Sequence, residues 1–275
     1  MTVFVNFRER AVGGGTTEPS LLQTDGAGNL AVLSEASFLS RLARRDVLFA
    51  VHGFNVSRAQ GVRAYQRLEA ALGLPSQAVF IGVLWPGDSW LPVLNYPFEG
   101  STAMDCGRRL ARFCDRKLTV AASLSFVSHS LGARLVLEAT QVMRSSTRSV
   151  CLTAGAINDD CLVREYAGAF KNSIKVSVLA SRRDLVLKLA YPIGDPIADL
   201  LHADHQPFTP ALGYDGPSRA VGATIPPWQI PDDENYNHSD YFPSGDTNGP
   251  DPTGRWVRPV AFMRRAFLNT QQTWP

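Results

Sequence analysis

The sequence lacks any run of about 18 apolar residues, which is the length that a membrane-spanning helix needs. Its N-terminus, Met-Thr-Val-Phe-Val-Asn-Phe-Arg, lacks the basic segment followed by an apolar stretch that marks a signal peptide. It also has little excess charge, because 27 Lys and Arg against 25 Asp and Glu give a net charge of +2, with no long basic run. These absences predict a cytoplasmic protein with no membrane span and no nucleic-acid partner.

Cysteine is scarce as well. The four cysteines form no C-x-x-C pair, and the five histidines have no zinc-like spacing around them, so the sequence predicts neither a metal nor another cofactor. Thiols outside disulfides fit a reducing compartment. Gly13-Gly14-Gly15 is not followed by Lys and Ser or Thr, which argues against a phosphate-binding loop. The oligomeric state is left open.

What the sequence does have is an alternation of short apolar runs with amphipathic segments. Its 275 residues, 45% of them hydrophobic, suffice for one sizeable core, so we expect a single domain over residues 1–275. Continuous apolar runs suit strands buried on both faces of a parallel sheet. They predict strands at Val3–Phe7, Asp46–Val51, Ala78–Leu84, Leu118–Val127, Val150–Ile157 and Ile174–Ala180. Helices are expected from a Ser34 cap to Arg44 and over Arg58–Leu72, Met104–Arg116, Leu131–Met143 and Trp256–Leu268. This order predicts an α/β fold with a doubly wound, mostly parallel sheet.

Two segments lack this periodicity. Residues 11–29 are rich in Gly and Thr and are expected to form a turn region. Residues 202–254 are rich in Pro, Gly and Asp, and we expect a long irregular excursion over the C-terminal edge of the sheet. So long a loop in a compact domain usually serves function, and its part from His202 to Asn237 is a candidate partial lid in which Trp228 faces the pocket.

The strongest chemical signal is Ser128-His129-Ser130-Leu131-Gly132, which follows a predicted strand and opens a predicted helix. This is the setting of a nucleophile elbow, where a sharp turn forces the serine into a strained conformation and needs small residues two positions to either side. Gly132 meets that need, and Ser128 is a small substitute for the usual glycine. The turn lifts the Ser130 hydroxyl off the sheet edge, beside helix N–H groups that favour an oxyanion. The alternative is a serine-rich strand end that matches by chance.

The second signal is His52-Gly53-Phe54-Asn55, at the end of an earlier predicted strand. The loop in this position supplies one oxyanion-hole N–H to such sites, and Gly53 allows a close backbone approach. We therefore assign the two oxyanion donors to the N–H groups of Phe54 and Leu131. His52 precedes the serine, which is the wrong chain order for the base, so its side chain is expected to brace the loop.

A nucleophilic serine needs an acid and a base, which in this kind of fold follow it in the order Ser, Asp or Glu, His. His238 lies where the base should be, with His205 in reserve and His202 a weaker rival. Asp184 follows the strand Ile174–Ala180, and its role would be to fix the His238 tautomer. Its alternative is a helix cap for Leu185–Leu189, and its rivals are Asp159, Asp160 and Asp195.

Together these motifs resemble a bacterial α/β-hydrolase family, esterase- or lipase-like, whose substrates are largely unassigned. The resemblance covers roughly Asp46 to Phe242 and rests on the two motifs above, on Trp85-Pro86, on the Ser181 to Asp184 segment and on His238-Ser239-Asp240-Tyr241. It implies an α/β-hydrolase fold without a large cap domain, with Ser130, Asp184 and His238 as the triad. The chain departs from the pattern in the long Pro- and Asp-rich stretch before His238.

The partner expected for such a site is a small-molecule ester substrate. Trp85, Trp90 and Tyr96 follow a central strand and are candidate substrate contacts, as are His52, Asn55 and His129. The aromatic residues have the alternative of covering the core. The leading hypothesis is a serine esterase working through an acyl-enzyme, and amide hydrolysis or acyl transfer on the same triad is the alternative. Because Ser128 replaces a glycine, a catalytically silent binding protein on this scaffold stays open as well.

Overall fold

The computed structural model describes residues 1–9, 15–25, 29–87, 92–189, 209–218, 227–246, 254–270 and 274–275, with the backbone alone at 92–99 and 227–228. Its strands are β1 (Val3–Arg8), β2 (Thr16–Thr24), β3 (Leu30–Val32), β4 (Asp46–Val51), β5 (Ala78–Leu84), β6 (Ser123–His129), β7 (Ser149–Thr153), β8 (Val176–Ala180) and β9 (Pro227–Gln229). Its helices are α1 (Glu35–Leu42), α2 (Arg58–Leu72), α3 (Pro92–Lys117), α4 (Gly132–Val142), α5 (Ala167–Lys171), α6 (Leu185–Leu189), α8 (Leu212–Asp215) and α10 (Val257–Phe267), with 3-10 turns η1 (Asp232–Glu234) and η2 (His238–Asp240).

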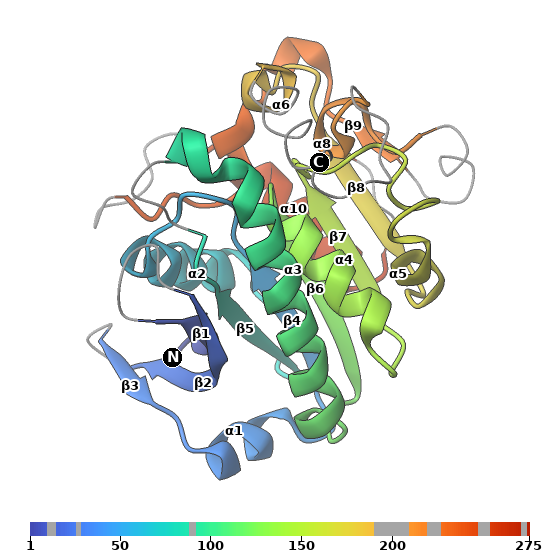
Figure 1. The fold of residues 1–275 in the computed structure, drawn as a ribbon. Helices are drawn as coiled ribbons and strands as arrows, with labels where there is room; N and C mark the ends of the chain where they lie inside the picture. The colour runs from blue at the N-terminus through green and yellow to red at the C-terminus, as the bar shows by residue number, and fades with distance from the viewer. Residues whose placement is uncertain are drawn as a thin grey trace.

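The described strands form one sheet in the order β3-β2-β1-β5-β4-β6-β7-β8-β9. Every pairing from β1 to β9 is parallel, while β2 and β3 are added antiparallel at one edge. This confirms the predicted doubly wound, mostly parallel sheet. Helices α1, α3, α4 and α5 pack on one face, and α2 and α10 on the other (Figure 1). No large cap stands over the sheet within the described residues.

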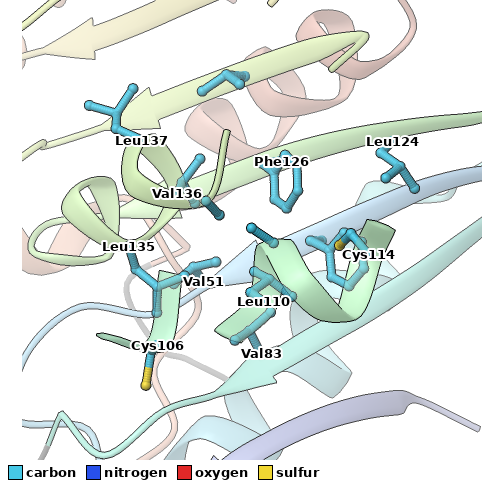
Figure 2. Close-up of a cluster of buried hydrophobic side chains, with 14 of the residues drawn as sticks. Val51, Val83, Cys106, Leu110, Cys114, Leu124, Phe126, Leu135, Val136 and Leu137 are labelled. Carbon is cyan, nitrogen blue, oxygen red and sulfur yellow. The ribbon is translucent and has the colours of Figure 1, made fainter. Parts of the chain in front are cut away.

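The central strands are buried on both sides, which is why they read as unbroken apolar runs. In β4, Val47, Phe49 and Val51 join the core under α3 and α4, while Leu48 and Ala50 join the core under α2 and α10. Figure 2 shows part of the first of these clusters, where strand residues lie beside apolar side chains of α3 and α4. All four cysteines are buried in these cores.

Capping residues fix the helix boundaries. The Ser34 hydroxyl accepts a hydrogen bond from the Ser37 N–H at the start of α1, which confirms the predicted cap. At the start of α2, Ser57 and Gln60 exchange reciprocal hydrogen bonds in a capping box. Gly73 ends α2 with a φ of 49°, a left-handed conformation that favours glycine.

The predicted bounds Asp46–Val51, Arg58–Leu72 and Ala78–Leu84 match β4, α2 and β5. Other predictions were wrong. Residues 11–29 are not only turn, because β2 occupies Thr16–Thr24 and pairs with β1. Residues 118–122 belong to a turn that follows α3 rather than to a strand. The strand predicted to reach Ile157 ends at Thr153, because Ala154 adopts a φ of 47° and turns the chain out of the sheet.

The region 202–254 is less irregular than predicted. Its described parts include α8, whose Leu212 and Gly213 N–H groups donate to the carbonyls of Ile157 and Gly155 after β7. They also include β9, which extends the sheet by pairing with β8. A sequence rich in proline hid this short edge strand, since Pro227 itself opens it.

The winding of the sheet reverses at its centre. The connection after β4 leads through α2 to β5 on one side, whereas that after β6 leads through α4 to β7 on the other. Neighbouring parallel strands whose connections leave in opposite directions open a crevice beyond their carboxyl ends, and ligands bind there in open α/β sheets. The two sequence motifs, at residues 52–55 and 128–132, lie at the ends of these two strands.

Candidate active site

Ser130 occupies the turn between β6 and α4 with a φ of 54°, so the strained conformation predicted for it is confirmed. Backbone hydrogen bonds hold the turn on both sides: the Ser130 N–H donates to the Thr153 carbonyl at 3.1 Å, and the Ser130 carbonyl accepts from Ala133 and Ala156. Because neighbouring strand and helix determine this conformation, it persists despite its cost.

The elbow depends on close backbone approaches. A Cβ atom at Gly132 would lie 2.6 Å from the His52 carbonyl oxygen, and one at Gly53 would lie 2.8 Å from Ser130 Cβ. Both positions therefore require glycine. Ser128, which stands where a further glycine is usual, is fully buried in β6, and its hydroxyl has no hydrogen-bond partner among the described residues. The turn forms with this serine in place.

The structure brings Ser130, His238 and Asp184 into one hydrogen-bonded chain. His238 Nε2 lies 2.8 Å from Ser130 Oγ, and His238 Nδ1 lies 2.7 Å from Asp184 Oδ2. Since the carboxylate can only accept, Nδ1 carries the proton, and the lone pair of Nε2 faces the serine hydroxyl. The two distances are those of direct hydrogen bonds.

Asp184 has both of the predicted roles, because it orients His238 and also caps helix α6. Its side chain is fully buried, and its second oxygen, Oδ1, accepts the Leu187 N–H at 3.0 Å in the first turn of α6. One oxygen therefore caps the helix while the other holds His238. The rival Asp160 pairs instead with Arg164 at 2.5 Å. The pKa of Asp159 is raised, by burial and by the carboxylates of Asp160 and Asp215.

The base lies on a segment with little regular structure, and charged side chains anchor it at both ends. Before and within η2, Arg255 donates to the Glu234 carbonyl at 2.6 Å and pairs with Asp240 at 2.9 Å. Asp240 also accepts the Asn237 N–H at 2.8 Å. Arg255 further lies over the Tyr236 ring, 4.4 Å from its centroid.

After η2 the chain docks on helix α2. Arg63 donates to the Gly245 carbonyl at 2.6 Å and Arg67 to the Ser244 carbonyl at 2.5 Å. A Cβ at Gly245 would lie 2.1 Å from the Gln60 carbonyl oxygen, so only glycine permits this contact. Sequence reasoning did not identify these anchors, because each joins residues more than 170 positions apart.

The loop after β4 carries the predicted oxyanion donor Phe54, which is half-buried against the core. Asn55 follows with a φ of 57°, and its N–H donates to the Gly87 carbonyl at 2.5 Å. Arg8 of β1 donates to the carbonyls of Val56 and Trp85. These contacts tie the loop to the end of β5. Leu131, the other predicted donor, stands at the N-terminus of α4.

His52 supports this loop from its buried side. It is buried, its Nδ1 donates to the Gly53 carbonyl at 2.8 Å, and its ring stacks on Trp85 at 5.5 Å between centroids. Burial lowers the pKa of His52 to about 3, so the ring is neutral. Trp85 is fully buried and donates its indole N–H to the His52 carbonyl at 2.9 Å. The prediction that Trp85 contacts the substrate was therefore wrong. The alternative, that it covers the core, is confirmed.

His129 is half-buried between the nucleophile and the base. Its Nε2 donates to the His238 carbonyl at 2.7 Å, and its ring lies against the rings of His238, Tyr241 and Phe242. Desolvation by burial, together with the neighbouring His238, lowers the pKa of His129 to about 3. It therefore stays neutral at physiological pH.

Several predicted residues lie outside the described part of the chain, namely Trp90, Asp195, His202 and His205, together with the side chains of Tyr96 and Trp228. Among the described residues, no group of His, Cys, Asp and Glu side chains is arranged to hold a metal ion. No described helix is both long and apolar enough to cross a membrane.

Comparison with known proteins agrees with this architecture. Residues 32–207, more than half of the chain, match the family described as alpha/beta hydrolase of unknown function (DUF900). The chain belongs to this α/β-hydrolase family. No curated protein matches this α/β hydrolase.

Three solved structures illustrate its structural relatives. The esterase PE8 is 16% identical with a TM-score of 0.47, covering 82% of this chain and 94% of its own. An esterase of Pyrobaculum calidifontis is 12% identical with a TM-score of 0.44, covering 82% and 77%. LpqC, a poly(3-hydroxybutyrate) depolymerase from Bordetella parapertussis, is 11% identical with a TM-score of 0.41, covering 92% and 91%.

Proposed function

We propose that this α/β hydrolase cleaves carboxylic esters of small molecules through an acyl-enzyme formed on Ser130. The observation that carries the proposal is the chain from Asp184 Oδ2 to His238 Nδ1 and from His238 Nε2 to Ser130 Oγ, at 2.7 and 2.8 Å. A nucleophile, a base in contact with it and a third group that orients the base are the parts that covalent acyl transfer needs.

In the proposed reaction, His238 removes the proton from Ser130 as the serine oxygen attacks the ester carbonyl. The N–H groups of Leu131 and Phe54 would hold the resulting oxyanion, and each such donor is typically worth roughly 3–4 kcal/mol of transition-state stabilisation. His238 then gives its proton to the leaving alcohol. Water, activated by the same imidazole, attacks the acyl-enzyme and releases the acid.

The position of the Leu131 N–H supports its assignment as an oxyanion donor. It stands at the beginning of α4, where the first N–H groups of a helix have no partner within the helix. It makes no hydrogen bond to any described residue. The macrodipole of α4 adds a partial positive charge at the same point, which favours an anion there. The chemical environment beside Ser130 therefore suits a developing negative charge.

Turnover of p-nitrophenyl acetate and butyrate tests this function, with the wild type compared with Ser130→Ala. We expect turnover by the wild type and its loss in the variant, since the hydroxyl is the attacking group. Equal rates in the two proteins would refute the proposal. Product analysis with added alcohols and amines then separates hydrolysis from acyl transfer, because a transferase would form new esters or amides.

A further inference from the structure

His129 lies where three parts of the site meet. It directly precedes Ser130, it donates to the His238 carbonyl at 2.7 Å, and its Nδ1 lies 3.0 Å from the point where a Cβ of Gly53 would stand. The nucleophile, the base and the oxyanion loop therefore all adjoin one imidazole. None of the roles in the proposed reaction uses this side chain.

The base lies on a segment with little regular structure. His238 opens η2, a single 3-10 turn that does not belong to the sheet. The Arg255 contacts hold Glu234 and Asp240, and the Arg63 and Arg67 contacts hold Gly245 and Ser244. His129 makes its hydrogen bond to the main chain of His238 itself.

We infer that His129 is a positioning residue, which holds the imidazole of His238 in line with Ser130 by donating its Nε2–H to the His238 carbonyl. This inference rests on the proposed function of the triad. Since His129 and Ser130 are consecutive residues at the end of β6, the hydrogen bond transmits the rigid position of the sheet directly to the base.

The packing around the ring supports this role. The His129 ring lies 4.8 Å from that of His238 and 5.4 Å from that of Phe242, between centroids. Its acceptor is a carbonyl oxygen, so Nε2 must carry the proton. Burial lowers the pKa of His129 to about 3, so the ring is neutral above that pH, and the carbonyl acceptor keeps its one proton on Nε2.

The same contact argues against a direct role in substrate binding, the function that the sequence alone predicted for His129. Its Nε2–H already faces His238 rather than a ligand. A positioning residue affects the rate of the chemical step, because displacing a base by about 1 Å can cost on the order of 100-fold. A contact that binds the substrate equally strongly in the ground state and in the transition state would instead change KM when it is lost.

Two substitutions separate the hydrogen bond from the ring. His129→Phe keeps a ring of similar size and removes the donor, whereas His129→Gln places an amide N–H as many bonds from Cβ as Nε2. We expect His129→Phe to lower kcat about 10- to 100-fold with KM within about twofold, and His129→Gln to recover most of the loss. Lys117→Ala, which breaks the exposed pair with Glu35, is the control and should leave kcat unchanged.

A second readout does not depend on turnover. The proton that His238 Nδ1 shares with Asp184 gives a downfield proton NMR signal, which we expect in the wild type and His129→Gln and expect to be lost or broadened in His129→Phe. A wild-type kcat and an unchanged signal in His129→Phe would overturn the inference, as would a raised KM with unchanged kcat in both variants. If the wild type shows no Ser130-dependent turnover, the proposed function fails, and the NMR signal alone then decides whether His129 positions His238.

Discussion

Replacing Asp184 by Asn tests how the buried carboxylate acts on His238. The residue is fully buried, so water cannot replace it, and its two oxygens have different partners, His238 Nδ1 and the Leu187 N–H. The amide of asparagine has the shape of the carboxylate, but its single oxygen can accept a hydrogen bond from only one of these two donors. If its oxygen continues to accept from Leu187, its NH2 group faces His238 and forces the imidazole proton onto Nε2, where it blocks the base.

The opposite orientation of the amide keeps the right tautomer but sets the NH2 group against the Leu187 N–H, which costs about 1–3 kcal/mol for an unsatisfied buried donor. Either orientation also removes the charge that stabilises the imidazolium. In a related constellation on another fold, this substitution lowers kcat about 10⁴-fold, equivalent to about 5.4 kcal/mol. We expect a loss of about 10³- to 10⁴-fold for Asp184→Asn.

The assay is kcat and KM for p-nitrophenyl butyrate, with a thermal melt to show that the variant is folded. Asp184→Ala is the matched comparison, because it also removes the α6 cap and should be less stable than Asp184→Asn. A folded Asp184→Asn variant that keeps more than a tenth of the wild-type kcat would refute the role assigned to this carboxylate.

Two further outcomes are expected. The free energy of unfolding should fall as pH falls from about 6.5 to 3, because His52 and His129, each with a pKa near 3 in the folded chain, bind a proton in that window only after unfolding. His52→Phe should reduce this slope by up to about 1.4 kcal/mol per pH unit in urea titrations, and an unchanged slope would mean that His52 protonates equally well in the folded chain. Gly132→Ala should destabilise the protein by about 1–3 kcal/mol, since its Cβ would lie 2.6 Å from a backbone oxygen, and an unchanged urea midpoint would contradict that close approach.

The sequence predicted the parts of the fold whose signal is local. The strands β4 and β5 are apolar throughout because both faces are buried, and α2 has a serine cap, an apolar stripe and a terminal glycine. The strand β2 escaped prediction because it contains Pro19 and is only partly buried, next to the short edge strand β3. The early end of β7 depends on the turn at Ala154, which no residue preference marks.

In the site, too, residues with a local sequence signal were predictable, whereas contacts between distant residues were not. Ser130 was predictable because its elbow needs particular neighbours, and Gly53 and Gly132 are required by the close approaches seen here. His238 was predictable only from chain order, since the Arg63 contact that anchors its segment joins residues 182 positions apart. Trp85 was misplaced because an aromatic residue after a strand suits a pocket rim and a core equally well.

Labelling by a fluorophosphonate is the most direct test of whether Ser130 is an activated nucleophile. The probe should modify the folded wild type at one residue, which peptide mass spectrometry identifies as Ser130, and both Ser130→Ala and His238→Ala should prevent the reaction. Absence of an adduct on the folded wild type, or an adduct at another residue that persists in Ser130→Ala, would show that Ser130 is not the activated nucleophile.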